Sequence, residues 1–484
     1  ASCPAEGASG GGLADMPQAA LQAIASVGRP RRAPMRPGAF AWAAPLGQRR
    51  TSAWLHWVVS SLLAVLVLWI DPFGVFAASQ RLSQDSANRI LGPLYPATGR
   101  DQVTVVLWRD SSLAPRTLTW PIPLAQHARA LSAILNHRPK AVFVDIAYTN
   151  DRGDPGVEAL REEIANYADA RIPLLFAAPS ETGEAIIPAL ASAMPTDKLA
   201  GVPKPIEDGF TRTYPQEVLV GGTPLKTAAF RLLQSTLPVE GSMQVADARM
   251  RRSIEVVWGT DPAPINRDII EDCAKPAPTA PLQRLLAALT QPGSLIQPCP
   301  YAPQIPVQAI FDSTHDPRFT ELIKGRFVIL GTALKSAPDD VMSPVHGRLP
   351  GPHLHAMALD NLLSFGDRYK SREPEMLLKA LKAFGVVLML GAFLAACGKR
   401  AGSGGASSGS WLRGVVAVVV VITIAVITAV TSFAIFDLPP ADYIGTLALA
   451  LATFGVVRAG AVETAIGLRP WRSRAQAATR IRST

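Results

Sequence analysis

The chain contains little cysteine, with four residues among 484. No third cysteine and no histidine lies near enough in sequence to Cys273 and Cys299 to complete a zinc site. We therefore interpret this pair as a disulfide formed in an oxidising compartment, with a metal site as the alternative. Cys3 and Cys397 are expected to remain unpaired.

Charge is scarce in four stretches, residues 51–70, 377–398, 414–436 and 443–457. The first three are about 20 residues long, which is enough to cross a hydrocarbon core of about 30 Å. The fourth spans only if it continues past Arg458 toward Leu468. The last two stretches lack the charged side chains that transporters and proton pumps carry at membrane depth, so a transport function is disfavoured.

Basic residues are concentrated beside these stretches and predict their orientation. Residues 1–53 carry six basic and two acidic side chains, and the tail 458–484 carries six arginines and one glutamate. The turn 437–442 has two aspartates and no basic residue. Because basic flanks stay in the cytoplasm, both termini are expected there and the large middle segment is expected outside.

Two other interpretations are weaker, one of the first apolar stretch and one of the net charge. A cleaved signal peptide would have a shorter apolar core and small residues at its cleavage site, whereas Trp69-Ile70-Asp71-Pro72 follows here, so an uncleaved anchor is favoured. The net charge of +9 is explained by topology and contact with anionic lipid, and it does not indicate nucleic-acid binding.

The middle segment alternates apolar runs with helical patterns. Strands are expected at 103–108, 141–146, 173–178, 253–258 and 326–331, and helices at 124–136, 156–170, 184–194, 224–234, 281–290 and 352–363. This alternation predicts an α/β domain with a mainly parallel sheet. Four transmembrane helices accompany it, one before the domain and three after it.

The predicted layout divides the chain as follows: a disordered basic cytoplasmic tail at 1–50, a first transmembrane helix at 51–78, an extracytoplasmic domain at 79–372, further transmembrane helices at 377–398, 411–436 and 441–466, and a basic cytoplasmic tail at 467–484. The expected location is a bacterial inner membrane, with the domain in the periplasm. Homo-oligomerisation is left open.

Several short motifs occur in a fixed order between about residues 80 and 370. They are a strand ending at Asp110, a Trp-Pro element at Trp120, the strand 141–146 with Asp145, the segment 207–212 with Arg212, the strand 325–332, and the segment 339–356 with Asp339, Asp340 and His355. This order resembles the type-two CHASE domain family, an extracellular sensory module of some bacterial histidine kinases, nucleotide cyclases and serine/threonine kinases. The resemblance implies one span before the domain and three after it.

The chain departs from the family pattern in two places. The family usually has an aromatic residue and an arginine in the Trp-Pro element, where this chain has Ile122 and Leu124. The family's usual cytoplasmic kinase or cyclase has no counterpart in the segment after Val457. The resemblance therefore implies an input module that acts on a separate cytoplasmic effector.

The resemblance implies a ligand-binding role for Asp110, Trp120, Asp145, Arg212, Asp339, Asp340 and His355. Asp145 ends a strand at the carboxyl edge of the sheet, where open α/β folds bind ligands, but such an aspartate also serves as a helix cap or a loop acceptor. His353 and His355 could join Asp339 and Asp340 as metal ligands. Residues at i and i+2 do not share a helix face, so His355 is expected instead to anchor a turn. No catalytic residue, metal or cofactor is predicted.

The leading hypothesis is a membrane-bound sensor that binds an extracytoplasmic ligand or protein and signals through its transmembrane helices. The alternative is a non-catalytic scaffold subunit of an envelope complex. A periplasmic metal-dependent enzyme is the third hypothesis, and it depends on the Asp and His residues above.

Overall fold

The computed structural model describes residues 46–71, 73–113, 118–179, 184–203, 209–237, 253–270, 273, 280–290, 292–296, 298–312, 317–372, 375–398 and 409–458. Cys3, most of the predicted N-terminal tail, the C-terminal tail and the end of the predicted fourth span lie outside these residues. The chain divides into two compact units, Ala1–Ser52 and Ala53–Thr484. The elements below belong to the second unit, apart from the first residues of α2.

A six-stranded parallel sheet forms the centre of the α/β domain. Its order is β4 (Leu199–Ala200), β3 (Leu174–Ala177), β2 (Ala141–Val144), β10 (Phe327–Ala333), β1 (Val103–Arg109) and β9 (Gln304–Pro306). β1 and β10 pair in register from Val103 and Phe327 to Arg109 and Ala333. Both are almost completely buried, because a parallel sheet is covered on both faces. The prediction of a mainly parallel sheet is confirmed.

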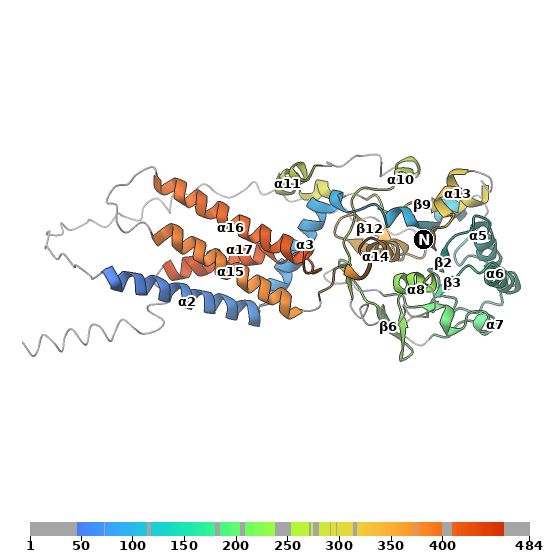
Figure 1. Cartoon of the computed structure of the whole chain (residues 1–484). Coiled ribbons are helices and arrows are strands. Elements are labelled where there is room, and N and C mark those ends of the chain that lie inside the picture. Colours follow the sequence, from blue (N-terminus) through green and yellow to red (C-terminus); the bar gives the residue numbers. More distant parts are fainter. Residues whose placement is uncertain are drawn as a thin grey trace, which may run out of the picture. The chain divides into compact units, whose positions relative to one another are not determined.

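Helices cover the two faces of this sheet. One face packs against α5 (Leu124–Asn136), α6 (Val157–Asp169), α12 (Val307–Asp312) and α13 (Pro317–Ile323). The other packs against α8 (Ala228–Ser235) and α14 (Pro352–Phe365). Figure 1 shows α8 and α14 on one side of β2 and β3, and α5 and α6 on the other. The predicted helix 184–194 is shorter in the structure, where α7 covers Pro188–Ala191.

Three small antiparallel pairs lie outside the main sheet. They are β5 (Thr213–Tyr214) with β8 (Ile254–Glu255), β6 (Glu217–Val220) with β7 (Thr223–Lys226), and β11 (Asp340–Ser343) with β12 (Gly347–Pro350). The middle of the chain also forms α10 (Pro264–Ile269) and α11 (Pro281–Thr290). Of these elements, the sequence patterns indicated only the strand at 253–258 and the helix at 281–290.

The apolar helices flank the domain in sequence. α15 (Glu375–Gly398) and α16 (Gly409–Ala434) are long and apolar enough to cross a membrane. α17 (Tyr443–Arg458) is shorter, with an apolar stretch over Tyr443–Thr453. α2 (Leu46–Ile70) and α3 (Val75–Leu91) together could form one broken span. The structure thus has two helices after the domain that could span a membrane, and the count of four spans remains a prediction.

The predicted first span, 51–78, covers parts of two helices, and its limits in a membrane remain a prediction. α2 begins at Leu46, and it ends at Ile70. The chain then turns by 83° into α3. Asp71 lies at this break, and its carboxylate accepts hydrogen bonds from the backbone N–H groups of Phe76 and Ala77, both at 3.1 Å. These bonds satisfy amides at the start of the new helix.

Candidate functional site

Asp145, His355 and Tyr214 form a buried polar chain at the carboxyl edge of the sheet. Asp145 follows β2, and its backbone N–H donates to the Leu330 carbonyl at 2.7 Å. His355 Nε2 lies 3.4 Å from Asp145 Oδ2, and both side chains are at most 3% exposed. His355 Nδ1 is 2.8 Å from Tyr214 Oη. Two of the predicted site residues therefore meet, but inside the protein.

Protons can be placed along this chain from its partners. Tyr214 Oη accepts a hydrogen bond from the Ala229 backbone N–H at 3.1 Å, so its own proton is free to go to His355 Nδ1. The Nε2–H of His355 then faces Asp145. Burial raises the pKa of Tyr214, which keeps the phenol protonated and able to donate.

Asp110 and Asp340 are exposed at this edge of the domain and belong to different secondary-structure elements. Asp110 starts a short helix after β1, and its Oδ2 lies 3.4 Å from the backbone N of Lys335. Asp340 pairs across the β11–β12 hairpin with Arg348 at 3.6 Å. Neither contacts the Asp145 chain through a described hydrogen bond or ion pair.

Asp339 is fixed by the approach to α14. Its carbonyl accepts a hydrogen bond from the Gly351 backbone N–H at 2.5 Å. A Cβ added to Gly351 would lie 2.5 Å from Asp339 Oδ2, so a larger residue there would have to displace this carboxylate. Asp339 thus holds the loop before α14, and its neighbour Asp340 points to a different partner.

The metal hypothesis gains no support from these positions. His353 Nε2 lies 2.7 Å from Gln304 Oε1, while His355 faces Asp145 and Tyr214. Within the described ranges, no three His, Cys, Asp or Glu residues gather as metal ligands would. The i, i+2 spacing of the two histidines sends them to different partners, as the helix geometry requires.

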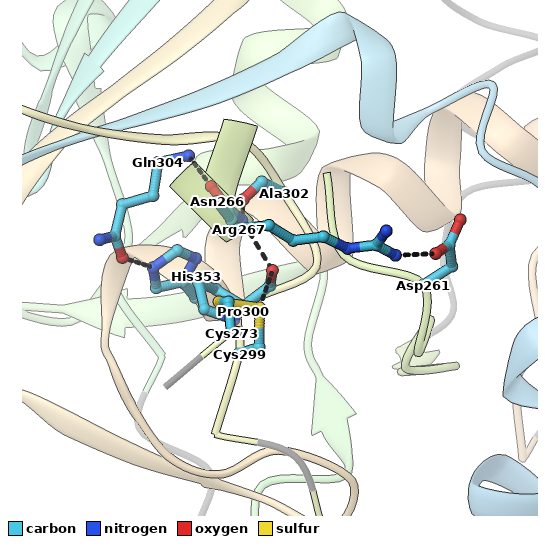
Figure 2. Close-up of a disulfide and its surroundings, with 9 residues drawn as sticks. All are labelled: Asp261, Asn266, Arg267, Cys273, Cys299, Pro300, Ala302, Gln304 and His353. Carbon is cyan, nitrogen blue, oxygen red and sulfur yellow. Dashed lines mark hydrogen bonds and ion pairs between the residues drawn. A yellow bond between two sulfur atoms is a disulfide. The ribbon is translucent and has the colours of Figure 1, made fainter. Parts of the chain in front are cut away.

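Figure 2 shows the bonded pair Cys273 and Cys299 beside α10. Asn266 on α10 donates to the carbonyls of Pro300 and Ala302, both at 2.8 Å, and accepts from the Gln304 N–H at 2.8 Å. Gln304 belongs to the edge strand β9 and contacts His353 of α14. The disulfide therefore closes a loop that is tied to both the sheet and α14.

Trp120 lies in a different part of the domain. It is partly buried and packs against the core on the α5 and α6 side of the sheet. The carbonyl of the next residue, Pro121, accepts a hydrogen bond from Arg152 at 3.2 Å. Its contacts indicate a packing role.

Arg212 forms a buried bidentate ion pair with Asp85 of α3. Nε and Nη2 of Arg212 lie 2.9 and 3.0 Å from the two carboxylate oxygens, and the side chains are 5% and 10% exposed. Bidentate arginine–carboxylate pairs are among the strongest charge-assisted hydrogen bonds. Arg212 therefore joins the domain to the helix that follows α2, and its ligand-binding role stays a prediction.

Glu255 makes the corresponding contacts from the neighbouring strand. Its buried carboxylate accepts a hydrogen bond from Gln84 of α3 and pairs with Arg372, which lies just before α15. Its backbone N–H donates to the Lys370 carbonyl at 2.8 Å. We call Gln84, Asp85, Arg212, Glu255 and Arg372 the junction network, because they join the domain to both helices that flank it in sequence.

The segment before α15 also contacts the turn between α16 and α17. Lys370 Nζ lies 3.1 Å from Asp437 Oδ1, and Arg368 Nε lies 3.0 Å from Asp437 Oδ2. Burial lowers the pKa of Lys370, and the partnership with Asp437 opposes that shift. The acidic turn noticed in the sequence is thus paired with basic residues at the end of the domain.

Asp442 of the same turn is buried against α3. Its carboxylate accepts hydrogen bonds from Ser79, from Ser83 at 2.9 Å and from the Gly445 backbone N–H at 2.7 Å. Gln80 donates to the Pro440 carbonyl at 2.7 Å. α3 is therefore hydrogen-bonded to the domain through Asp85 and to the α16–α17 turn through Ser83.

A surface pocket of about 480 Å³ lies beside the β4 edge of the sheet. It is bounded by α7, by the segment before it and by the β6–β7 hairpin. Its lining is mainly apolar, with Glu184 as its carboxylate. None of the predicted ligand-binding residues lines it.

Sequence reasoning missed the polar partners on α3, and it used the aspartates of the α16–α17 turn only to predict orientation. Gln80, Ser83, Gln84 and Asp85 form a polar stripe in a 17-residue helix. Because this polar stripe follows an apolar stretch in the sequence, it could have indicated a helix that buries its polar side. Long-range pairing with Arg212 could not be read from it.

The architecture is that of an α/β domain with a parallel sheet, flanked in sequence by apolar helices. Residues 60–398 match the family model of the CHASE2 domain. This is more than half of the chain, and the protein belongs to the CHASE2 domain family, a family of extracellular sensory domains. No curated protein and no solved structure matches the chain.

Proposed function

We propose that this protein is a receptor of a bacterial inner membrane, with its CHASE2 domain in the periplasm and both termini in the cytoplasm. Four spans would carry it, formed by α2, α15, α16 and α17. The basic flanks of the apolar stretches and the acidic turn at Asp437 support this orientation. The domain binds an extracytoplasmic ligand or protein, and the helices transmit the change to a separate cytoplasmic effector.

The observation that carries the proposal is the position of the short β5–β8 pair. Arg212 precedes β5 and Glu255 ends β8, and together they contact α3 and the segment before α15. Tyr214 in β5 contacts His355 at the carboxyl edge of the sheet. One small element thus touches the interior of the sensory domain and both connections to the membrane helices.

The ligand would bind in the pocket beside β4. Val220, Thr223 and Leu225 of the β6–β7 hairpin line it, and this hairpin follows β5 directly in the chain. A ligand that draws the hairpin toward α7 would pull on β5. The apolar lining and Glu184 suit a small molecule with an apolar body and a cationic group.

Signalling requires two states that the ligand binds unequally. The junction network supplies an element that could differ between them, because Arg212 and Glu255 hold α3 on one side and Arg372 on the other. A shift of β5 relative to α3 would strain these pairs. The strain would reach the α16–α17 turn because Asp437 pairs with Lys370, before α15, and Asp442 accepts a hydrogen bond from Ser83 of α3.

Affinity capture of the full chain from solubilised membranes tests the effector. The wild type and Asp85→Asn would be compared, since the variant keeps the shape but removes the charge paired with Arg212. A receptor predicts a cytoplasmic protein whose captured amount differs between the two. If no cytoplasmic protein is captured under any condition, the signalling proposal is refuted.

A scaffold subunit would behave differently in the same experiment. It predicts capture of periplasmic or membrane proteins in amounts that Asp85→Asn leaves unchanged. A thermal-shift screen of small molecules on the full chain adds a second discrimination. A receptor gains stability by RT ln(1 + [L]/Kd) with its ligand, and Leu225→Arg in the pocket should abolish that gain because it fills the apolar site and repels the cationic group.

A further inference from the structure

α11 has its apolar side facing outward. Leu282, Leu285 and Leu286 are 67%, 41% and 55% exposed. Their spacing of three and four residues places them on one side of the helix. Arg284 lies on the opposite side, and it is 2% exposed. A helix on a water-facing surface shows the reverse arrangement.

Arg284 attaches this helix to α3. Its Nη1 donates to the Arg89 carbonyl of α3 at 2.6 Å, and Figure 1 shows α11 beside α3. Arg284 is the only charged residue in Pro281–Thr290, so the outward side of α11 carries no charge. Ile296, just beyond the helix, adds a further apolar side chain that is 39% exposed.

α3 shows the same inversion independently. Its buried side chains are mainly polar and include Gln80, Ser83 and Asp85. Val75 and Leu82 on its other side are 56% and 53% exposed. The helix follows α2 after a turn of 83°, and its first half contacts the α16–α17 turn through Ser83 and Asp442. α3 therefore connects α11 directly to the ends of the apolar helices.

We propose that the leucine face of α11 lies in the outer leaflet of the membrane, as a surface-lying helix that does not span. A contiguous apolar, uncharged face next to membrane helices fits lipid, because the acyl boundary accepts leucine side chains and a watery surface does not. The membrane continues past the ends of the spans along α3 to α11. The inference rests on the membrane topology proposed above.

Spin labelling of the full chain in nanodiscs of phosphatidylethanolamine and phosphatidylglycerol tests the placement. A background with Cys3→Ser and Cys397→Ser leaves only the bonded Cys273 and Cys299. Labels are attached through Leu286→Cys, through the matched control Gln283→Cys on the same helix, and through Val419→Cys, an α16 position that is 55% exposed. The accessibility of each label to oxygen, which concentrates in lipid, and to a water-soluble nickel chelate is then measured. High oxygen accessibility indicates lipid, and high nickel accessibility indicates water.

The expected result is a several-fold lower nickel accessibility at 286 than at 283, with oxygen accessibility at 286 close to that at 419. Equal nickel accessibility at 286 and 283, with 419 still in lipid, overturns the inference and leaves the topology intact. Spin–spin broadening at 286 that disappears on dilution with unlabelled protein overturns it in favour of a second copy. A water-accessible 419 refutes the topology and the inference together.

Discussion

Asp85 and Arg212, 127 residues apart in sequence, are joined by two parallel hydrogen bonds of 2.9 and 3.0 Å inside the protein. One residue belongs to the helix that follows the first apolar segment, and the other precedes a strand of the sensory domain. The pair therefore fixes the domain to its membrane connection. The following expectations depend on this and related contacts.

Removal of one partner of this pair should destabilise the protein strongly. Arg212→Leu leaves the Asp85 carboxylate buried without its counter-charge, and such a loss costs about 3–5 kcal/mol. The double variant Asp85→Leu with Arg212→Leu should recover much of that loss. Thermal unfolding of the four proteins in detergent gives the double-mutant cycle, and a double variant less stable than either single one would contradict it.

Asp360 should make the domain less stable as pH rises toward neutrality. Burial raises the pKa of this carboxyl to about 7, so the folded state retains a proton that the unfolded state has lost above about pH 4. Stability falls between these two pH values and is then constant. The loss is at most about 4 kcal/mol, because one pKa unit corresponds to about 1.4 kcal/mol.

Asp360→Asn provides the check. The amide resembles the neutral carboxyl in shape and does not titrate, so the stability gap between variant and wild type should widen in favour of the variant from pH 5 to pH 8. Thermal melts across that range measure it. A gap that stays constant with pH would show that Asp360 is charged in the folded protein throughout.

Two buried histidines should make the domain sensitive to acid. Burial lowers the pKa of His127 to about 4 and that of His353 to about 3. The unfolded chain takes up protons at about pH 6.5, so stability decreases as pH falls from there toward these lower values. In thermal melts at a series of pH values, His353→Gln should lose less stability than the wild type as the pH falls. If both proteins lose stability equally with falling pH, His353 does not contribute to the acid sensitivity.

Gly331 should not accept even a methyl group. A Cβ there would lie 2.3 Å from Pro352 Cγ at the start of α14, and overpacking of this kind costs about 1–3 kcal/mol. Gly293→Ala is the matched control, since nothing lies within 4 Å of its added Cβ. Thermal melts should separate the two variants, and equal stability would show that α14 moves away freely.

The disulfide should stabilise the excursion beside α10. Cys273 and Cys299 are 26 residues apart. Closing a loop of this size removes conformational entropy from the unfolded chain and so stabilises the folded protein by about 3 kcal/mol. The double variant Cys273→Ser with Cys299→Ser should melt lower by a corresponding amount. Reductant should lower the melting temperature of the wild type alone, and an equal response of both proteins would exclude this role.

The sequence by itself determined the parallel sheet, the apolar helices and the family. Runs such as 103–108 and 326–331 are apolar at every position because both faces of a parallel strand are covered, and that pattern needs only local information. Asp145 was singled out because it ends such a strand, whereas His355, expected to anchor a turn, lies within α14. Span-length segments were visible for the same reason, since a bilayer demands an uninterrupted apolar run.

Only the tertiary structure decided what the polar residues do. The pairing of Arg212 with Asp85 was not foreseen, and neither were the contacts of Glu255 with Gln84 or of Asp442 with Ser83. A charge in sequence does not say which distant residue will face it, because the partner is chosen by packing between elements far apart in the chain. α3 and α11 show the limit most clearly, since the side of an amphipathic helix that is buried depends on whether water or lipid lies beyond it.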